Sequence, residues 1–485
     1  MTASDPQPHG SYEDLRSLVE KVAHAAIQAE MSYNYDCSLH GDHYVHRASG
    51  YVVTSFPGPG GPPTGVVTLR AEPSAGLGDT QESDIHFDPT ADVYEPWTQA
   101  VEDVFRDWHD LPNPYDSSRF SGPATSVEDA ISVLACGGQV PGETSKPSGN
   151  ALAARLSFVV SELAPFNAAT VDAFSKNFLT WVAPSCMNDA VAGAALAAAY
   201  RTEEQIWIRS RKAITLIAEQ AAKAMYPIGT DAKAGWTVLG IMQGVVGLLV
   251  SGPVGAVVGV ANTLLSTVEK ATSLIPATPD TRELHGPNMQ VVLDNTAAAV
   301  KKLNERIRTE EQAVWEILDA MLQEMSGATG SEPKFAPPRP DDLFSETDPT
   351  DLVTAREEVY VDPGKLRTIG NDDMRFVGEQ IRNTAKAIDV FPGSSAFGRP
   401  SSIGLGPTGP SGLIEVLTDA LTTVLLNMGQ HCIDAGEVLA IAADAFSKTD
   451  AHVRDRLEQH RKEIADDLGP GDPTAHRDRP GREYA

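Results

Sequence analysis

The sequence predicts a mainly α-helical protein, an elongated helical bundle with only a small β element near its N-terminus. Aromatic residues make up 6% of the chain and hydrophobic residues 41%, a balance that favours helices over β-sandwiches. Alanine is abundant in the middle and C-terminal thirds. Apolar residues also recur every three or four positions over long stretches, which is the spacing of one helix face.

The bulk properties limit the classes of function. The net charge is −28, from 38 Lys and Arg against 66 Asp and Glu. Because so acidic a surface repels phosphate backbones, we expect no nucleic-acid partner. The four cysteines are scattered, so we expect no disulfide framework. The N-terminus lacks the basic and apolar regions of a Sec signal peptide. If the protein leaves the cell, we therefore expect a route that needs no Sec signal peptide, and otherwise a cytoplasmic location.

The N-terminal region, residues 1–90, is predicted to combine one helix with a β-hairpin. Ser11 and Asp14 form a capping box at the start of the helix. The β-branched runs 50–56 and 65–71 flank a Pro/Gly-rich loop, and such a pattern predicts two paired strands.

Residues 91–326 are predicted to form a central helical bundle. Ser126 and Asp129 resemble a second capping box. The string RTEEQ occurs at 201–205 and again at 308–312, and we interpret it as a faint repeat or a coincidence. The helices expected in this region span about 94–110, 126–136, 148–163, 167–182, 188–226 and 288–325.

An uncharged, glycine-rich run extends over residues 236–268. Ser251, Gly252 and Pro253 should divide it into two arms, and each arm is shorter than a bilayer core requires. We therefore predict an apolar helical hairpin buried inside the bundle. A hairpin that inserts into membranes under some conditions is the alternative.

The C-terminal third predicts a Pro-rich acidic linker at 327–354, a two-helix antiparallel hairpin at 355–465 and a disordered tail at 466–485. Two apolar stripes at coiled-coil-like spacing predict the hairpin, which we expect to fold independently of the rest. The first stripe is Leu366, Ile369, Met374, Val377, Ile381, Ala385 and Ile388, and the second is Ile414, Leu417, Leu421, Val424, Met428, Cys432, Ala435, Leu439, Ala442 and Phe446.

Three short motifs give this hairpin a resemblance to a known family. Val361-Asp362-Pro363 opens the first helix, Ala396-Phe397-Gly398 lies in the loop, and the second helix ends in Ala445-Phe446-Ser447-Lys448-Thr449-Asp450. Over these roughly 100 residues the chain resembles the EspC-like family of the Trp-X-Gly helical-hairpin group, which belongs to type VII (ESX) secretion of actinobacteria.

The resemblance implies export by type VII secretion, or association with its machinery, through a Tyr-x-x-x-Asp/Glu signal after the hairpin. Here Phe446 replaces the tyrosine and Asp450 occupies the acidic position. A full Tyr-x-x-x-Glu motif occurs at Tyr200 and Glu204, within a predicted helix. The implied partners are a small helical-hairpin protein and the type VII secretion ATPase.

A metal site is a separate candidate in the N-terminal region. Cys37, His40, His43 and His46 follow one another at intervals of three, and zinc prefers such ligands. However, a step of three alternates faces along a strand and drifts around a helix. The ligands would converge only in a loop or a 3₁₀ turn. A polar surface loop is the other interpretation.

No common catalytic motif is present: the chain lacks HExxH, Walker A, GxSxG and dinucleotide-loop patterns. We therefore expect no enzyme and no cofactor, although Cys136 before two glycines leaves a cysteine nucleophile open. With the family resemblance, the leading prediction is a type VII secretion-associated protein, either an exported substrate or a partner-binding helical scaffold, that acts by helix–helix association. The alternatives are a membrane-active effector that uses 236–268, which dye leakage from liposomes would reveal, and a metal-binding N-terminal domain, which stoichiometric zinc would reveal.

Overall fold

The computed structural model describes residues 11–40, 43–47, 52–55, 67–68, 86–87, 90–135, 151–166, 168–225, 235–237, 281–284, 286–326, 335–339, 361–447, 459–460 and 462–463. Its helices are α1 (Leu15–Tyr33), α2 (Glu95–Phe105), α3 (Ser121–Leu134), α4 (Ala151–Leu163), α5 (Ala169–Phe174), α6 (Thr180–Met225), α9 (Met289–Ser326), α10 (Pro363–Thr368), α11 (Arg375–Ile388) and α12 (Ser411–Ser447). Its strands are β1 (Cys37–His40), β2 (His43–His46), β3 (Val52–Ser55), β4 (Val67–Thr68), β5 (His86–Phe87), β6 (Gly235–Thr237) and β7 (Thr281–Glu283).

Short turns of other helix types extend several of these helices. The π turns are Thr90–Tyr94, Ser175–Leu179 and Ile369–Met374, and the 3₁₀ turns are Tyr12–Asp14, Arg106–Trp108 and Ser394–Phe397.

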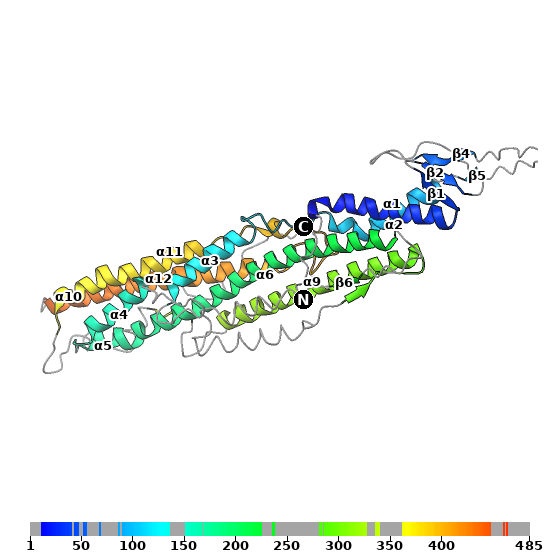
Figure 1. Ribbon diagram of the computed structural model, residues 1–485. Helices are drawn as coiled ribbons and strands as arrows, with labels where there is room; N and C mark the ends of the chain where they lie inside the picture. Colours follow the sequence, from blue (N-terminus) through cyan, green and yellow to red (C-terminus); the bar gives the residue numbers. More distant parts are fainter. Residues whose placement is uncertain are drawn as a thin grey trace, which may run out of the picture.

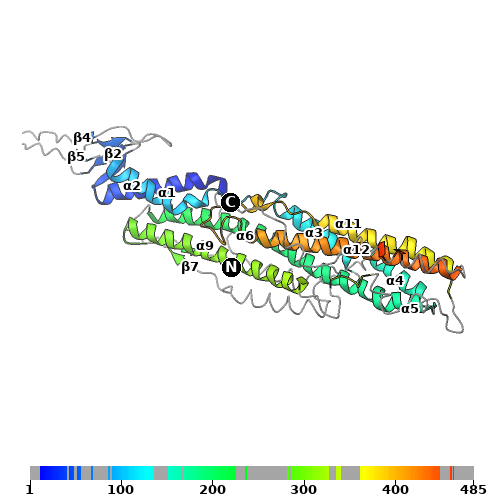
Figure 2. The same cartoon turned by 180° about the vertical axis from the view of Figure 1, so that it is seen from behind.

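The architecture is an elongated helical bundle built along α6, as Figure 1 shows, and the predicted fold class is confirmed. α6 contacts α1, α3, α9 and α12. Seen from behind in Figure 2, α9 runs beside α6 while α11 and α12 lie together over the other half of the bundle. β6 follows α6, β7 precedes α9, and the two strands pair. The C-terminal end of α6 therefore lies near the N-terminal end of α9, and the two helices run antiparallel.

Two helix boundaries differ from the sequence prediction. The expected break between the helices at 167–182 and 188–226 is absent. α6 begins directly after the π turn that ends at Leu179, and it continues through Pro184. A proline inside a helix costs about 3 kcal/mol. Burial of almost every residue from 185 to 200 offsets this cost. α3 begins at Ser121, so the expected capping box at Ser126 lies within the helix and is wrong.

The predicted N-terminal helix and β element are both present. The backbone N–H of Ser11 donates to the Asp14 carboxylate over 3.2 Å, as in a capping box. The hairpin itself joins β1 and β2, and β3 extends it to three strands. The runs 50–56 and 65–71 were expected to pair with each other. Instead, β3 pairs with β2 and β4 pairs with β5.

The C-terminal helical hairpin forms as predicted. All seven residues of the first apolar stripe are buried, as are all of the second except Val424 and Phe446, which are partly buried. Asp362 caps the first helix by accepting the N–H groups of Gly364 and Lys365 over 3.0 and 3.1 Å. The motif that opens this helix therefore has a direct structural role.

Paired glycines bring the two arms of the hairpin unusually close. Gly370 lies against the backbone of Gly436, and Gly378 lies against the backbone of Gly429. A Cβ atom on any of the four would overlap backbone or side-chain atoms of the opposite arm. The apolar stripes predicted the pairing of the arms, but not this close contact.

The hairpin is not independent of the rest of the chain, which corrects the sequence prediction. α11 contacts α3, and α12 contacts α6 and α9. Their side chains belong to one hydrophobic core that also includes α1. An ion pair adds to this docking, since the guanidinium of Arg155 on α4 lies 2.6 Å from the buried carboxylate of Asp373. Phe335, in the segment predicted to be an exposed linker, is also buried in this core.

The predicted apolar hairpin at 236–268 lies outside the described residues, apart from residues 236 and 237. These two belong to strand β6 rather than to a helix. Among the helices that the structure describes, α12 has the length and hydropathy of a membrane span. Its stripe nevertheless packs into the bundle core.

A glycine substitution at the hairpin crossing should destabilise the fold. Gly436→Ala places a methyl group against the carbonyl oxygen of Gly370, and we expect a loss of roughly 1–3 kcal/mol, as for other overpacked sites. Urea unfolding followed by circular dichroism measures this. Gly412→Ala is the matched control, because a Cβ there meets nothing within 4 Å. Equal stability of the two variants would contradict the close contact.

Candidate functional site

The loop between α11 and α12 lies across α6 and α9 and forms the candidate site. Its backbone is held by turns, and four of its glycines, Gly393, Gly404, Gly406 and Gly409, have positive φ angles of 85°, 62°, 103° and 52°. A side chain at Gly404 would overlap the Glu311 carboxylate, and one at Gly409 would overlap the Arg399 guanidinium. Glycine is therefore required at these two positions both for backbone conformation and for space.

Phe397 anchors the first part of this loop. Its ring is fully buried and meets Phe120 edge-on, with ring centroids 5.3 Å apart. The rings of Tyr200 and Phe391 each lie 6.3 Å away. Arg119 donates to the carbonyl oxygen of Ala396 over 3.1 Å. The loop motif that carries the family resemblance is thus a docking element between the hairpin and helices α3 and α6.

Arg399 carries the second part of the loop into the bundle. Its side chain is fully buried and forms ion pairs with Glu311 of α9 and, over 3.9 Å, with Glu203 of α6. The guanidinium carbon lies 4.9 Å from the centre of the Trp207 ring, an arrangement that adds a cation–π attraction. Trp207 also donates its Nε1–H to Glu203 over 3.1 Å. We call Glu203, Trp207, Glu311 and Arg399 the arginine centre.

Polar contacts along α9 fix the rest of the loop. The Glu311 carboxylate accepts the backbone N–H of Leu405 over 2.7 Å. Asn304 donates to the carbonyl oxygen of Ser402 over 2.6 Å and accepts the N–H of Gly404 over 2.7 Å. Ile403 and Pro410 are buried in this segment, and the contacts that join it to α9 are polar.

The arginine centre has two carboxyl groups for one guanidinium. Burial, together with the nearby charge of Glu203, raises the pKa of Glu311 to about 8, against the lowering effects of Arg399 and of the Leu405 hydrogen bond. Burial likewise raises the pKa of Glu203, against Arg399 and the Trp207 hydrogen bond. One guanidinium balances one carboxylate, and burial favours a proton on the second carboxyl group.

The repeated string RTEEQ supplies both carboxyl groups. Glu203 belongs to the first copy on α6 and Glu311 to the second copy on α9. The antiparallel packing of the two helices brings the copies face to face around Arg399. The sequence showed the repeat, but it contained no signal that Arg399 would join them.

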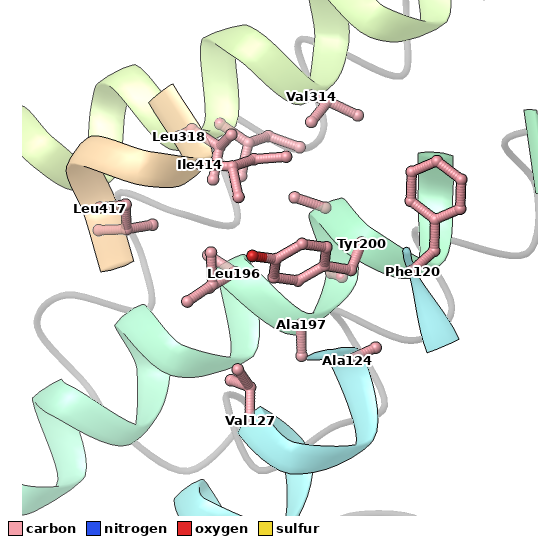
Figure 3. Close-up of a cluster of buried hydrophobic side chains, with 14 of the residues drawn as sticks. Phe120, Ala124, Val127, Leu196, Ala197, Tyr200, Val314, Leu318, Ile414 and Leu417 are labelled. Carbon is pink, nitrogen blue, oxygen red and sulfur yellow. The ribbon is translucent and has the colours of Figure 1, made fainter. Parts of the chain in front are cut away.

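Tyr200, a candidate for the export signal, lies in the bundle core. Its ring is fully buried beside Leu196 and Ile414, as Figure 3 shows. Burial raises the pKa of its hydroxyl group above the ordinary value. Glu204 lies nearer the surface and pairs with Arg201 over 3.4 Å. An export receptor would reach Tyr200 only if the bundle opened.

The second candidate signal lies at the end of the hairpin. Phe446 is partly buried against the core, one residue before α12 ends. Asp450 lies outside the described residues.

The Cys and His series does not form one metal site. Cys37 lies opposite His46 and His40 opposite His43 in the β1–β2 ladder. Because successive side chains alternate across a strand, Cys37 and His40, three positions apart on β1, lie on opposite faces. Cys37 packs into a small apolar cluster, where burial raises the pKa of its thiol. In the described part of the chain, no group of three or more His, Cys, Asp or Glu side chains is placed to hold a metal.

The remaining cysteines are in keeping with a structural role. Cys186 and Cys432 are buried, and neither they nor Cys37 form disulfides. Cys136, the open candidate for a nucleophile, lies outside the described residues.

Comparison with known proteins adds no relative. No protein-family model, no curated protein and no solved structure matches this chain significantly.

Removal of the central guanidinium should strongly destabilise the protein. Arg399→Met leaves Glu203 and Glu311 buried without a countercharge, and we expect a loss of about 3–5 kcal/mol in the free energy of unfolding. Arg367→Met is the matched control, because the ion pair of Arg367 with Asp444 is partly exposed and should contribute about 0–1 kcal/mol. Urea unfolding of both variants measures the difference, and similar losses would refute the role of the arginine centre.

Proposed function

We propose that the protein is a type VII secretion-associated helical scaffold, which is exported or which binds a partner in that pathway. The observation that carries the proposal is the C-terminal hairpin, whose two long arms and Phe397-bearing loop have the form that the family resemblance implies. The Asp362 cap and the buried Phe397 support it further, because two of the three resemblance motifs have defined structural roles.

The mode of association follows from the packing of the hairpin. Its apolar seam is already covered by α3, α6 and α9 of the same chain. An isolated hairpin would need a partner's helices to bury this seam, whereas here the chain provides them itself. We propose that the assembled bundle, rather than a free hairpin seam, is the form that the secretion partner meets.

Secretion assays test this function directly. We expect the full chain to appear in the culture medium of an actinobacterial host with an intact type VII system. It should stay inside cells of the same strain without the system's ATPase, because the proposed export route requires that ATPase. A cytoplasmic marker protein controls for lysis. Equal amounts in both media would refute type VII export.

The two candidate roles of Tyr200 can be separated by paired substitutions. Because the ring is fully buried, Tyr200→Ala should cost about 3–5 kcal/mol of stability, like other buried aromatic truncations. It should therefore lower the cellular and secreted pools together. Tyr200→Phe keeps the ring, and we expect normal stability and normal secretion. A folded Tyr200→Phe protein that is not secreted would instead identify Tyr200 as part of the export signal.

A further inference from the structure

The arginine centre joins the loop of the hairpin to two long helices, α6 and α9. α6 and α9 are long and packed along their length into the hydrophobic core. Residues 399–410 are held to them by Arg399 and by the backbone bonds to Glu311 and Asn304. The Ser402 hydroxyl also donates to the exposed carboxylate of Asp107, in the turn after α2. If the centre loses its charge balance, the loop is the part with the least apolar packing to keep it in place.

The charges around the centre are few and come from three elements. Glu203 faces it from α6, Glu311 from α9 and Arg399 from the loop. On α9, the neighbouring Glu310 is also buried and forms an ion pair of 2.6 Å with Arg306. The charge of Arg399 lowers the pKa of both Glu203 and Glu311, and the charge of Glu203 raises the pKa of Glu311. No second buried cation of the described residues faces these two carboxyls closely enough to compensate a second negative charge.

We propose that the arginine centre is a proton-operated latch: one shared proton keeps residues 399–410 closed on α6 and α9, and loss of that proton releases them. With the proton bound, one carboxylate balances one guanidinium. Without it, a second negative charge must stay buried beside the first, and opening of the loop admits water to both. Release uncovers Trp207 and the backbone groups of the loop, so proton binding controls access to this end of the hairpin. The latch does not depend on the proposed secretion function.

The direction of the pH response follows from proton linkage. The closed state holds the proton on Glu311 up to a pKa of about 8, whereas an opened, hydrated carboxyl releases it near its ordinary value of about 4.3. The closed state thus binds more protons, and its advantage declines as pH rises between these two values. Above the upper value the response should level off.

Hydrogen exchange of the full-length protein at pH 5.5, 7 and 8.5 tests the latch. After correction for the intrinsic rate of each amide, protection of Gly404 and Leu405 should fall by up to about 10-fold per pH unit. Core amides of the hairpin, such as Val377 and Leu425, should change much less. Parallel loss at the loop and core amides would mean global unfolding, and it would overturn the latch.

Variants decide which group carries the proton. Glu311→Gln leaves one carboxylate for one guanidinium and keeps an acceptor for the Leu405 N–H, so loop protection should become independent of pH. Glu203→Gln should have the same effect and provides a second test if the first variant folds poorly. Glu379→Gln is the matched control, since it removes an exposed carboxylate of α11 and should keep the wild-type response. A pH response that persists in both Glu203→Gln and Glu311→Gln would overturn the proposal.

Discussion

The whole bundle depends on the need to surround α6. From residue 190 to residue 200 every position except Ala194 is buried, so this apolar part of the helix has no face that water can cover. A helix that is apolar all round must be enclosed by other elements. α3 and α12 enclose it at Gly193, where a Cβ would meet Ile131 and Leu421. Since α6 is longer than either of these helices, other segments must continue the cover, and the bundle becomes elongated (Figure 1).

Farther along α6 the buried residues become polar, and each brings a particular partner segment. Glu203 fixes the hairpin loop through Arg399. Arg211 fixes the N-terminal segment, because its guanidinium carbon lies 4.1 Å from the Tyr12 ring centre and its Nη2 donates to Leu111 over 2.8 Å. Buried charges are expensive without partners. Apolar packing therefore encloses α6, while these polar contacts determine which segment packs beside each part of the helix.

The hairpin loop links two residues that the sequence singled out for different reasons. Phe397 belongs to the loop motif of the family resemblance, and Tyr200 belongs to a candidate export motif on α6. Their rings lie 6.3 Å apart in one aromatic cluster that also includes Phe120. Their position gives both residues a direct role in docking the hairpin. Packing requirements alone can therefore account for residues of the loop motif and of the candidate export motif.

The sequence by itself determined the helices, the apolar stripes of the hairpin and the small N-terminal β element. These features depend on local propensity and on spacing within one segment. Only the tertiary structure decided that α6 continues through Pro184, because burial on distant helices offsets the cost of the proline. The strand conformation of β1, likewise, placed Cys37 and His40 on opposite faces of the sheet. The arginine centre could not be predicted, because a buried carboxylate is stable only where a distant segment supplies its countercharge. No feature of the sequence near Glu203 or Glu311 predicts that Arg399 contacts them.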